Sequence, residues 1–378
     1  MFDYEILRCI WWLFLGVLLI GFAITGGFDL GAAILLPFLG KTDTERRVII
    51  NTVGATWEGN QVWLVTAGGA LFAAFPMAYA VSFSGFYLAL LLTLFALIIR
   101  PVGFDYRSKL PSEKWRGNWD IALFVGGFVP SLIFGVAFGN LLQGVPFHFD
   151  NDMRVFYDGS FWALLNPFAI VAGLLSVAMI IMHGAVFLQL KTEGDIQQRS
   201  EKVVMIAAIA TLVIFALAGV WVANIDGYAI TSTVLHDAPS NPLKKVVEKT
   251  AGLWMANYKQ YPLLILVPSL GFAAGTLTIL LSKKQYLKSA FVTSSLTLAS
   301  VILTAGVSMF PFLMPASVSI NHSLTIWDAS SSHTTLAIMF WVTLIFLPIV
   351  LIYTSWVFRV LSGKITLAHI QNNDHTAY

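Results

Sequence analysis

Runs of about 20 or more mainly apolar residues recur along this sequence and constrain its fold more than any other feature. A helix of that length crosses roughly 30 Å of hydrocarbon. Apolar side chains make up 57% of the 378 residues, and only 11% are charged. Soluble domains carry roughly 25% charged residues, so the sequence predicts an integral membrane protein.

Nine such runs predict an all-α, polytopic fold with nine transmembrane helices. We expect one transmembrane domain over residues 1–378, arranged as two four-helix bundles plus one peripheral helix. An external loop over about 225–261 and a cytoplasmic tail over about 359–378 complete the prediction. The apolar runs lie at about 9–38, 53–76, 79–99, 119–145, 162–189, 203–224, 262–281, 289–312 and 334–358.

Lysine and arginine gather in alternate connections between these runs. Sixteen of the 22 basic residues fall on one side, and the basic residues of the 225–261 loop weigh little because that loop is long. The bias predicts that the N-terminus lies outside and that the C-terminus is cytoplasmic. The net charge of +2 argues against a nucleic-acid partner. The sixteen are Lys41, Arg46, Arg47, Arg100, Arg107, Lys109, Lys114, Arg116, Lys191, Arg199, Lys202, Lys283, Lys284, Lys288, Arg359 and Lys364.

Acidic residues inside the predicted helices are few. Asp29 and Glu58 lie about 10–15 Å below the cytoplasmic surface at 1.5 Å per residue. Asp105 and Asp120 stand near Arg100 at the mouths of two helices. Buried acids of this kind are typical of proton relays, so the four carboxylates are candidates for a ladder into the bundle. In the alternative, Asp29 or Glu58 pairs with Arg100 or stays protonated, and the other two acids are solvated.

Histidines give little support for a haem in this chain. Only His183 lies deep in a predicted helix, where a histidine is more often a packing residue than a ligand. The single Cys9 excludes paired thiolate sites, and we expect no metal site. We also assign no directly catalytic residue. The other histidines are His148, His236, His322, His333, His369 and His375, all in or near loops or the tail.

Glycine-rich stretches and tryptophans are the remaining features of the helices. GGFDLGAA, TAGGALFAA and FGVAFGN favour close helix contact in lipid. Most tryptophans lie near predicted interfaces, whereas Trp57 and Trp63 lie inside the second run. The motifs of hydrolases and of nucleotide-driven pumps do not occur.

Taken together, the ordered motifs resemble subunit II of cytochrome bd ubiquinol oxidase over essentially the whole chain. The stretches that carry the resemblance are FDYEILR with WW, GGFDLG, WEGNQVWLVTAGGALFAAFP, SGFY, RPVGFDYRSK, FGVAFGNLLQGVPF, ALAGVW, SNPL, LTAG with MFPFLMP, and LTIWDASSS.

The resemblance implies a quinol:dioxygen oxidoreductase of aerobic respiration in a bacterial inner membrane, where the outside N-terminus would be periplasmic. Its partner, subunit I, would hold haem b, haem d and the quinol site, so that this chain ligates none of them. Protons taken from the cytoplasm to make water would generate a proton motive force. Subunit II would help to line that proton entry and a route for dioxygen, and it could hold a structural ubiquinone. A small single-helix accessory subunit is a further possible partner.

Four residues acquire roles from the resemblance. Glu58 in WEGNQ matches an acid of the proton path, Asp29 matches the second acid of the GFD motif, and Asp105 matches the acid of GFDYR. Trp63 matches a residue near the proposed gas route.

Two departures from the family pattern alter the expected proton path. The family usually reads DGFD, whereas Gly26 occupies the first acidic position here, and Thr56 replaces the usual histidine or proline before WEGN. The path must therefore run differently, through Asp29 or through water.

Two rival functions remain open at this point. A secondary transporter would fit nine helices and buried acids, although it is expected to have broken helices around a polar site at the midplane. A pure scaffold would stabilise subunit I without touching protons, oxygen or quinone.

Overall fold

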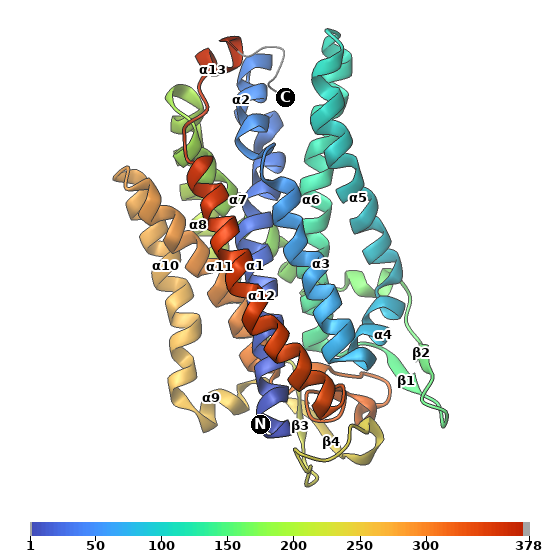
Figure 1. Cartoon of the computed structure of the whole chain (residues 1–378). Helices are drawn as coiled ribbons and strands as arrows, with labels where there is room; N and C mark the ends of the chain where they lie inside the picture. The colour runs from blue at the N-terminus through green and yellow to red at the C-terminus, as the bar shows by residue number, and fades with distance from the viewer. Residues whose placement is uncertain (1, 373–378) are drawn as a thin grey trace.

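A bundle of long helices runs from one end of the molecule to the other (Figure 1). The computed structural model describes residues 2–372. Within that range eight helices are long and apolar enough to cross a membrane, so the predicted all-α membrane fold is confirmed. They are α1 (Tyr4–Leu39), α5 (Tyr87–Tyr106), α6 (Glu113–Gln143), α7 (Pro167–Lys191), α8 (Gly194–Val222), α10 (Leu266–Lys283), α11 (Leu287–Met309) and α12 (His333–Val360).

The predicted helix over 53–76 corresponds to α3 (Trp57–Ala74), which packs beside α1 (Figure 1). Its 18 residues begin with a polar stretch that includes Glu58 and Asn60, so its apolar part is shorter than that of the other long helices. The count of nine transmembrane helices therefore stays a prediction.

The predicted helix over 79–99 is divided in the structure. Pro76 begins a short helix, α4 (Pro76–Gly85), because its fixed backbone angle suits the first position of a helix. After a break at Phe86, α5 starts at Tyr87 and continues beyond Arg100 to Tyr106. The predicted start at residue 79 lies within α4, and the predicted end at residue 99 falls before Tyr106, the last residue of α5.

A helix that the sequence did not predict, α2 (Asp43–Val53), follows α1. Its first turn is closed by a capping box, in which the Thr42 hydroxyl accepts from the Glu45 N–H and Glu45 accepts from Thr42. Arg199 at the start of α8 binds the same Glu45 carboxylate. Burial alone would raise the pKa of Glu45, but Arg199 and the neighbouring backbone N–H groups hold the pKa below its usual range. Glu45 therefore joins α2 to α8.

The helices form two groups, in agreement with the expected arrangement. The first contains α1, α3, α5 and α6, the second contains α7, α8, α10 and α11, and α7 joins them by packing against α1 and α6. The last long helix, α12, packs mainly on α1. Only 17% of the apolar stretch of α12 is buried, against 72% of that of α7, so α12 is peripheral and α7 is central.

Glycines allow the two groups to approach closely. A Cβ on Gly31 of α1 would lie 2.8 Å from the Gly184 Cα of α7, and closer still to the Ile180 carbonyl. A Cβ on Gly139 of α6 would lie 2.6 Å from the Ala169 Cα of α7. Both contacts leave no room for a side chain, so the tight packing predicted for GGFDLGAA and FGVAFGN is confirmed.

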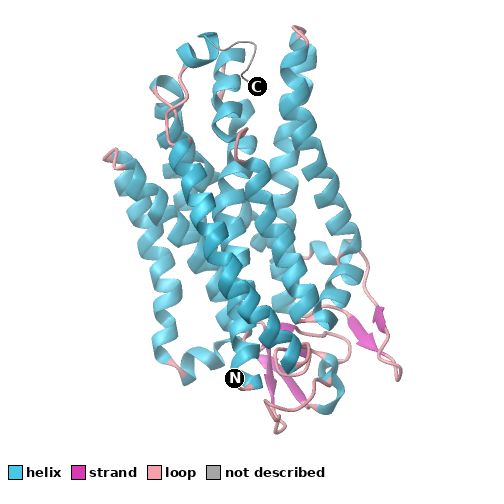
Figure 2. Ribbon diagram, in the orientation of Figure 1, coloured by secondary structure: helices cyan, strands magenta, loops and turns pink. Residues whose placement is uncertain are grey.

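The helices start and finish at two distinct ends of the bundle. We call the end where α1 begins the N-side end, and the end where α12 finishes the C-side end (Figure 1). Figure 2 shows that the strands gather at the N-side end. They form three antiparallel pairs: β1 (Phe147–Phe149) with β2 (Val155–Tyr157), β3 (Asp226–Ile230) with β4 (Val247–Ala251), and β5 (Phe312–Met314) with β6 (Leu324–Thr325). The short helices are α9 (Ala256–Gln260), α13 (Leu367–Asn372), η1 (Arg107–Lys109), η2 (Trp162–Leu165), η3 (Pro242–Lys244), η4 (Leu253–Met255), η5 (Pro262–Ile265) and η6 (Ile320–His322).

The loop over 225–261 is an ordered lid at the N-side end. Arg8 of α1 is buried and donates to the Ala238 carbonyl at 2.9 Å and to the Ser330 Oγ at 2.8 Å. A second clamp joins Lys245 Nζ to Asp328 Oδ2 at 2.8 Å, with both side chains almost fully buried. Burial lowers the pKa of Lys245, although Asp328 opposes that shift. The lid is thus held to the segment before α12 by two buried cations.

The glycine contact between α1 and α7 gives a direct test of the fold. Gly31→Ala should destabilise the protein by about 1–3 kcal/mol, because the helices must move apart to admit the methyl group. Gly16→Ala on the same helix is the control, since a Cβ there meets no atom within 4 Å. The midpoint of thermal unfolding of the purified protein should fall for Gly31→Ala alone. Equal midpoints for the two variants would contradict this packing.

Candidate functional site

Asp29 lies in the last third of α1, in a polar contact with α3. Its carboxylate is 1% exposed, and its Oδ2 accepts a hydrogen bond from Asn60 Nδ2 at 2.7 Å. In the described part of the chain the other oxygen, Oδ1, has no hydrogen-bond partner although it is buried. Asp29 is therefore a buried acid that is only half satisfied by its own subunit.

Arg100 of α5 is a second buried charge within a membrane-spanning helix. Its side chain is 1% exposed, its stem lies against Gly126 of α6, and its guanidinium lies 5.9 Å from the Phe104 ring centre. Among residues 2–372, no atom accepts a hydrogen bond from its Nε or Nη2. The predicted alternative was that Asp29 or Glu58 pairs with Arg100. Among the described residues neither acid forms a direct ion pair with Arg100 within 4.0 Å, so that alternative stays a prediction.

Glu58 faces outward from the first turn of α3, where the helix dipole favours a negative charge. Gly59, Val62, Thr66 and Gly69 follow it along the same exposed side, at the spacing of a helix face. Within the described residues, a Cβ on Gly59 or on Gly69 would meet nothing within 4 Å. We call these five residues the open face of α3. Within TAGGALFAA, Ala67 and Ala74 are buried, whereas the predicted close contact of Gly68 and Gly69 is not made among the described residues.

Asp105, near the end of α5, lies close to the first turn of α3, which carries Glu58. The residues that precede the two acids are in contact, because the ring centres of Trp57 and Phe104 are 5.6 Å apart. Asp105 is exposed, as is Glu58. The structure therefore brings these two acids to one α3–α5 contact, and both side chains remain open to the surroundings of the subunit.

Asp120 does not continue a ladder of acids and is not solvated. It is 2% exposed and accepts from Arg107 Nε at 2.5 Å and from Arg46 Nη1 at 2.7 Å. Asp43 at the start of α2 extends this network by binding Arg107 at 3.0 Å and Arg116 at 2.6 Å. The carboxylate of Asp120 in α6 thus joins α2 to η1, the short helix that follows α5, a role that the sequence did not predict.

His183 and Trp63 both take part in helix packing. The two ring nitrogens of His183 lie 2.8 Å from the Ser294 Oγ and 2.9 Å from the Ile24 carbonyl. Haem ligation by His183 would need one of these bonds to break, in keeping with the packing role expected for it. The Trp63 ring covers Gly21 of α1, where a Cβ would lie 2.5 Å from ring carbon Cε3.

His148, His236, His322 and His333 lie in or next to the connections at the N-side end, as expected. The structure places His148 in β1, His322 in η6, and His333 at the start of α12. The side chain of His369 and the whole of His375 lie outside the described residues.

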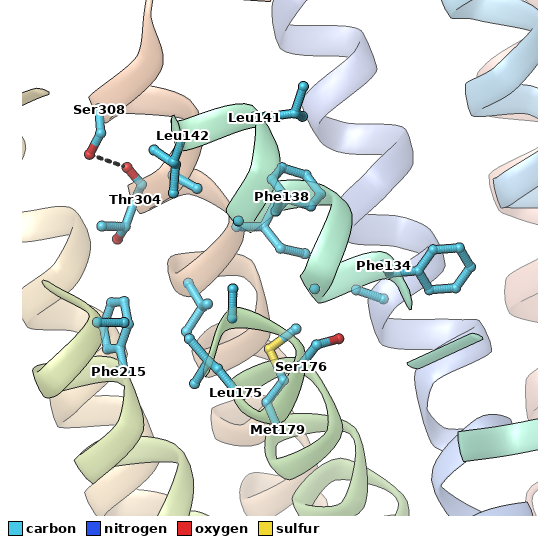
Figure 3. A pocket seen from close by; sticks show the side chains of 18 of the residues that line it. Phe134, Phe138, Leu141, Leu142, Leu175, Ser176, Met179, Phe215, Thr304 and Ser308 are labelled. Atoms are coloured by element: carbon cyan, nitrogen blue, oxygen red, sulfur yellow. Dashed lines mark hydrogen bonds between the residues drawn. The ribbon is translucent and has the colours of Figure 1, made fainter. Parts of the chain in front are cut away.

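A cavity of about 420 Å³ lies between α6, α7, α8 and α11, and α1 closes one side of it. Its walls are mainly apolar side chains such as Phe138, Leu175 and Phe215 (Figure 3). Ser308 lines one part of it and donates to the Thr304 carbonyl at 2.8 Å (Figure 3). The sequence did not reveal this cavity, because its volume depends on how side chains from four distant helices meet.

The chain matches the family of cytochrome bd terminal oxidase subunit II over residues 7–361. It belongs to this family. It is 55% identical to cytochrome bd-I ubiquinol oxidase subunit 2 of Escherichia coli (strain K12), with 100% of both chains covered. It is 32% identical to cytochrome bd ubiquinol oxidase subunit 2 of Bacillus subtilis (strain 168), with 93% of this chain and 96% of the relative covered.

A solved structure of bd oxidase from Geobacillus thermodenitrificans shares the fold. It superimposes with a TM-score of 0.71 at 16% identity and covers 94% of this chain and 98% of the solved one. The resemblance drawn from the motifs is therefore confirmed. This cytochrome bd subunit II is part of an oxidoreductase complex, and the transporter alternative is dropped.

The ion-pair network of cytochrome bd subunit II gives a second test. Asp120→Asn leaves the buried Arg107 short of a counter-charge, which should cost about 3–5 kcal/mol of stability. Asp105→Asn is the comparison, because that carboxylate is exposed. The midpoint of thermal unfolding should fall markedly for Asp120→Asn and little for Asp105→Asn. Asp120 would not have the structural role assigned to it if both variants unfolded alike.

Proposed function

We propose that the chain works beside a haem-bearing subunit I in a quinol:dioxygen oxidoreductase. Subunit I would carry haem b, haem d and the quinol site, and this chain would ligate none of them. The family membership and the name of the E. coli relative, a ubiquinol oxidase subunit, support this proposal. In the part of the chain that the structure describes, no group of three or more His, Cys, Asp or Glu side chains could hold a metal ion.

The open face of α3 is the single observation that carries the proposal. A charged side chain inside a membrane costs at least about 2.5–3.5 kcal/mol if it faces lipid. Glu58 faces out of the bundle, and the uncovered Gly59 and Gly69 beside it are residues that permit close approach of another helix. A helix of subunit I that covers this face would remove Glu58 from lipid and complete its surroundings.

Proton entry from the cytoplasm is proposed for the same region. The basic residues of the C-side end favour a cytoplasmic location for that end and a periplasmic N-terminus. Glu58 and Asp105 lie open at the α3–α5 contact, and Asn60 connects α3 to Asp29. Protons that enter here and are consumed with dioxygen in subunit I would generate a proton motive force without a separate pump. Trp63, at the α1–α3 contact, remains the candidate for the dioxygen route.

The apolar cavity is proposed as the site of a structural ubiquinone. Its apolar walls suit an isoprenoid tail, and Tyr258 and Ser308 bring hydroxyl groups to its lining. The Tyr258 hydroxyl lies 3.1 Å from the Ser308 Oγ, and burial raises the pKa of Tyr258, so this hydroxyl stays protonated. A small single-helix accessory subunit is a further proposed partner.

Glu58→Gln tests the proposed proton route. Quinol-dependent oxygen consumption by the purified complex should fall at least about tenfold, because the amide cannot pass a proton on. Glu113→Gln, at an exposed acid in the first turn of α6, is the matched control. Haem absorbance of the co-purified partner must be equal in all samples, so that loss of assembly is not mistaken for loss of proton transfer. A fully active variant with normal proton uptake would favour the scaffold alternative.

A cavity-filling variant tests the quinone site. Gly219 of α8 lines the cavity, and a Cβ there meets no atom within 4 Å, so Gly219→Leu should fill the space without a clash. Quinone extracted from the purified complex should decrease relative to the unchanged protein. Gly117→Leu, at an equally open glycine outside the cavity lining, should leave the quinone content unchanged. Unaltered quinone content in Gly219→Leu would exclude the cavity as its site.

A further inference from the structure

The turn between α10 and α11, at the C-side end, carries three lysines within six residues. Lys283, Lys284 and Lys288 are all exposed, and we call residues 283–288 the lysine turn. Neither α10, the lysine turn nor α11 contains an aspartate or a glutamate. Concentrated positive charge without acids in its own helices favours an anionic ligand.

The lysine turn differs from the arginines at the same end of the molecule. Among residues 2–372, no carboxylate lies within 4.0 Å of the Nζ atoms of its lysines or of Lys202 in α8. Several arginines of the C-side end, in contrast, are ion-paired with acids of their own chain. The four lysines are therefore available to a group from outside the chain. The paired arginines are Arg46, Arg107, Arg116 and Arg199.

Two hydrogen bonds fix the lysine turn against α8. Gln285 has a φ of 62°, a left-handed conformation that side-chain-bearing residues rarely adopt. Its Nε2 donates to Glu201 Oε2 at 2.7 Å, and its Oε1 accepts from Gln197 Nε2 at 3.0 Å. Lys202 follows Glu201 in the chain, so the same bonds bring it into one cluster with the lysine turn.

Each helix of this cluster carries an exposed apolar stripe that starts from a lysine. Residues at spacings of about four and seven lie on one face of a helix, and the apolar residues follow the lysines at such spacings. All of these apolar side chains are at least 40% exposed. Charge at the end of the helices and apolar surface along them match a phosphate and its acyl chains. The stripes are Leu277 and Leu280 below Lys284, Val292 and Leu296 below Lys288, and Ile206, Ile209 and Val213 below Lys202.

The cluster lies away from the face proposed for subunit I. In Figure 1, α10 is at the left edge of the bundle, whereas α3 and α5 lie to the right. A partner that covers the open face of α3 therefore leaves the lysine turn facing lipid. An acidic soluble protein could reach the lysines but not the stripes within the membrane, so a lipid is the occupant that fits both.

We propose that the lysine turn and Lys202 bind the phosphate of an anionic phospholipid, whose acyl chains lie along the exposed stripes of α8, α10 and α11. The phosphate oxygens accept from the lysine ammonium groups, which attract anionic headgroups at a membrane surface. An anionic lipid is favoured over a zwitterionic one, because α10, the lysine turn and α11 have no carboxylate to bind a headgroup amine. The inference goes beyond the proposed function and does not depend on the proton route.

Native mass spectrometry of the delipidated whole complex, titrated with phosphatidylglycerol, provides the first test. Combining Lys283→Gln, Lys284→Gln and Lys288→Gln should weaken binding at least about tenfold, because three of the four cations are lost. Combining Lys41→Gln, Lys109→Gln and Lys114→Gln removes the same charge from exposed lysines at the same end and is the matched control.

The first test also uses phosphatidylethanolamine, which should bind the unchanged complex and the lysine-turn variant alike. Equal affinity of the two triple variants for phosphatidylglycerol would overturn the inference, as would an equal loss of phosphatidylethanolamine binding. Haem absorbance of the co-purified partner must be the same in all samples. The readout is lipid binding and not oxygen consumption, so failure of this inference is distinct from failure of the proposed function.

The unchanged complex provides the second test, which needs no variant and therefore holds even where a substitution prevents assembly. A cryo-EM map of the complex in nanodiscs that contain phosphatidylglycerol should show phosphate density within hydrogen-bond distance of at least two of the four lysine Nζ atoms. A protein segment over the lysine turn, or the absence of headgroup density there, would overturn the inference.

Discussion

The close contact of α1 with α7 is the interaction on which the other parts of the structure depend. Gly31 and Gly184 bring the two backbones together, and α7 in turn packs against α6, α8 and α11. Lipid offers no hydrophobic gain for helix association, so fit between surfaces must supply the attraction. Because α1 also contacts α3 and α12, one close crossing fixes the position of the helices that carry Asp29 and Glu58.

The charged groups of the bundle fall into three classes, which differ in location and in what the side chains bind. At the C-side end Asp43 and Asp120 are paired with arginines, which fastens α2 to η1 and α6. In the middle of the bundle Asp29 and Arg100 are buried without a direct bond. On the open face of α3, Glu58 is not covered by its own chain. Paired charges stabilise the fold, whereas the functions proposed for charged side chains fall on those left unpaired or uncovered.

The sequence predicted the membrane class, the long helices and the family, because each depends on residues that are close together in the chain. It also singled out Asp29, Glu58 and Arg100, since a charge within an apolar run is visible without a structure. It could not show that Asp120 binds Arg46 and Arg107, which depends on how three separate helices are placed.

Local geometry set a second limit on prediction. The break at Phe86 between α4 and α5 leaves an almost unbroken apolar run, so hydropathy did not detect it. The capping box that begins α2 is readable as Thr42 and Glu45, but its connection to α8 through Arg199 is not local. The apolar cavity, likewise, is a gap between helices and not a property of any one of them.

The Arg8 clamp bears on the order in which the chain can reach its final state. Arg8 is translated early, whereas the lid carbonyl of Ala238 and the hydroxyl of Ser330 emerge from the ribosome much later. Until both have been made and have reached the same side of the membrane, the guanidinium must remain hydrated or bound elsewhere. The beginning of α1 is therefore locked only when most of the chain has been made, and a nascent chain that stops before Ser330 keeps an unfinished N-side end.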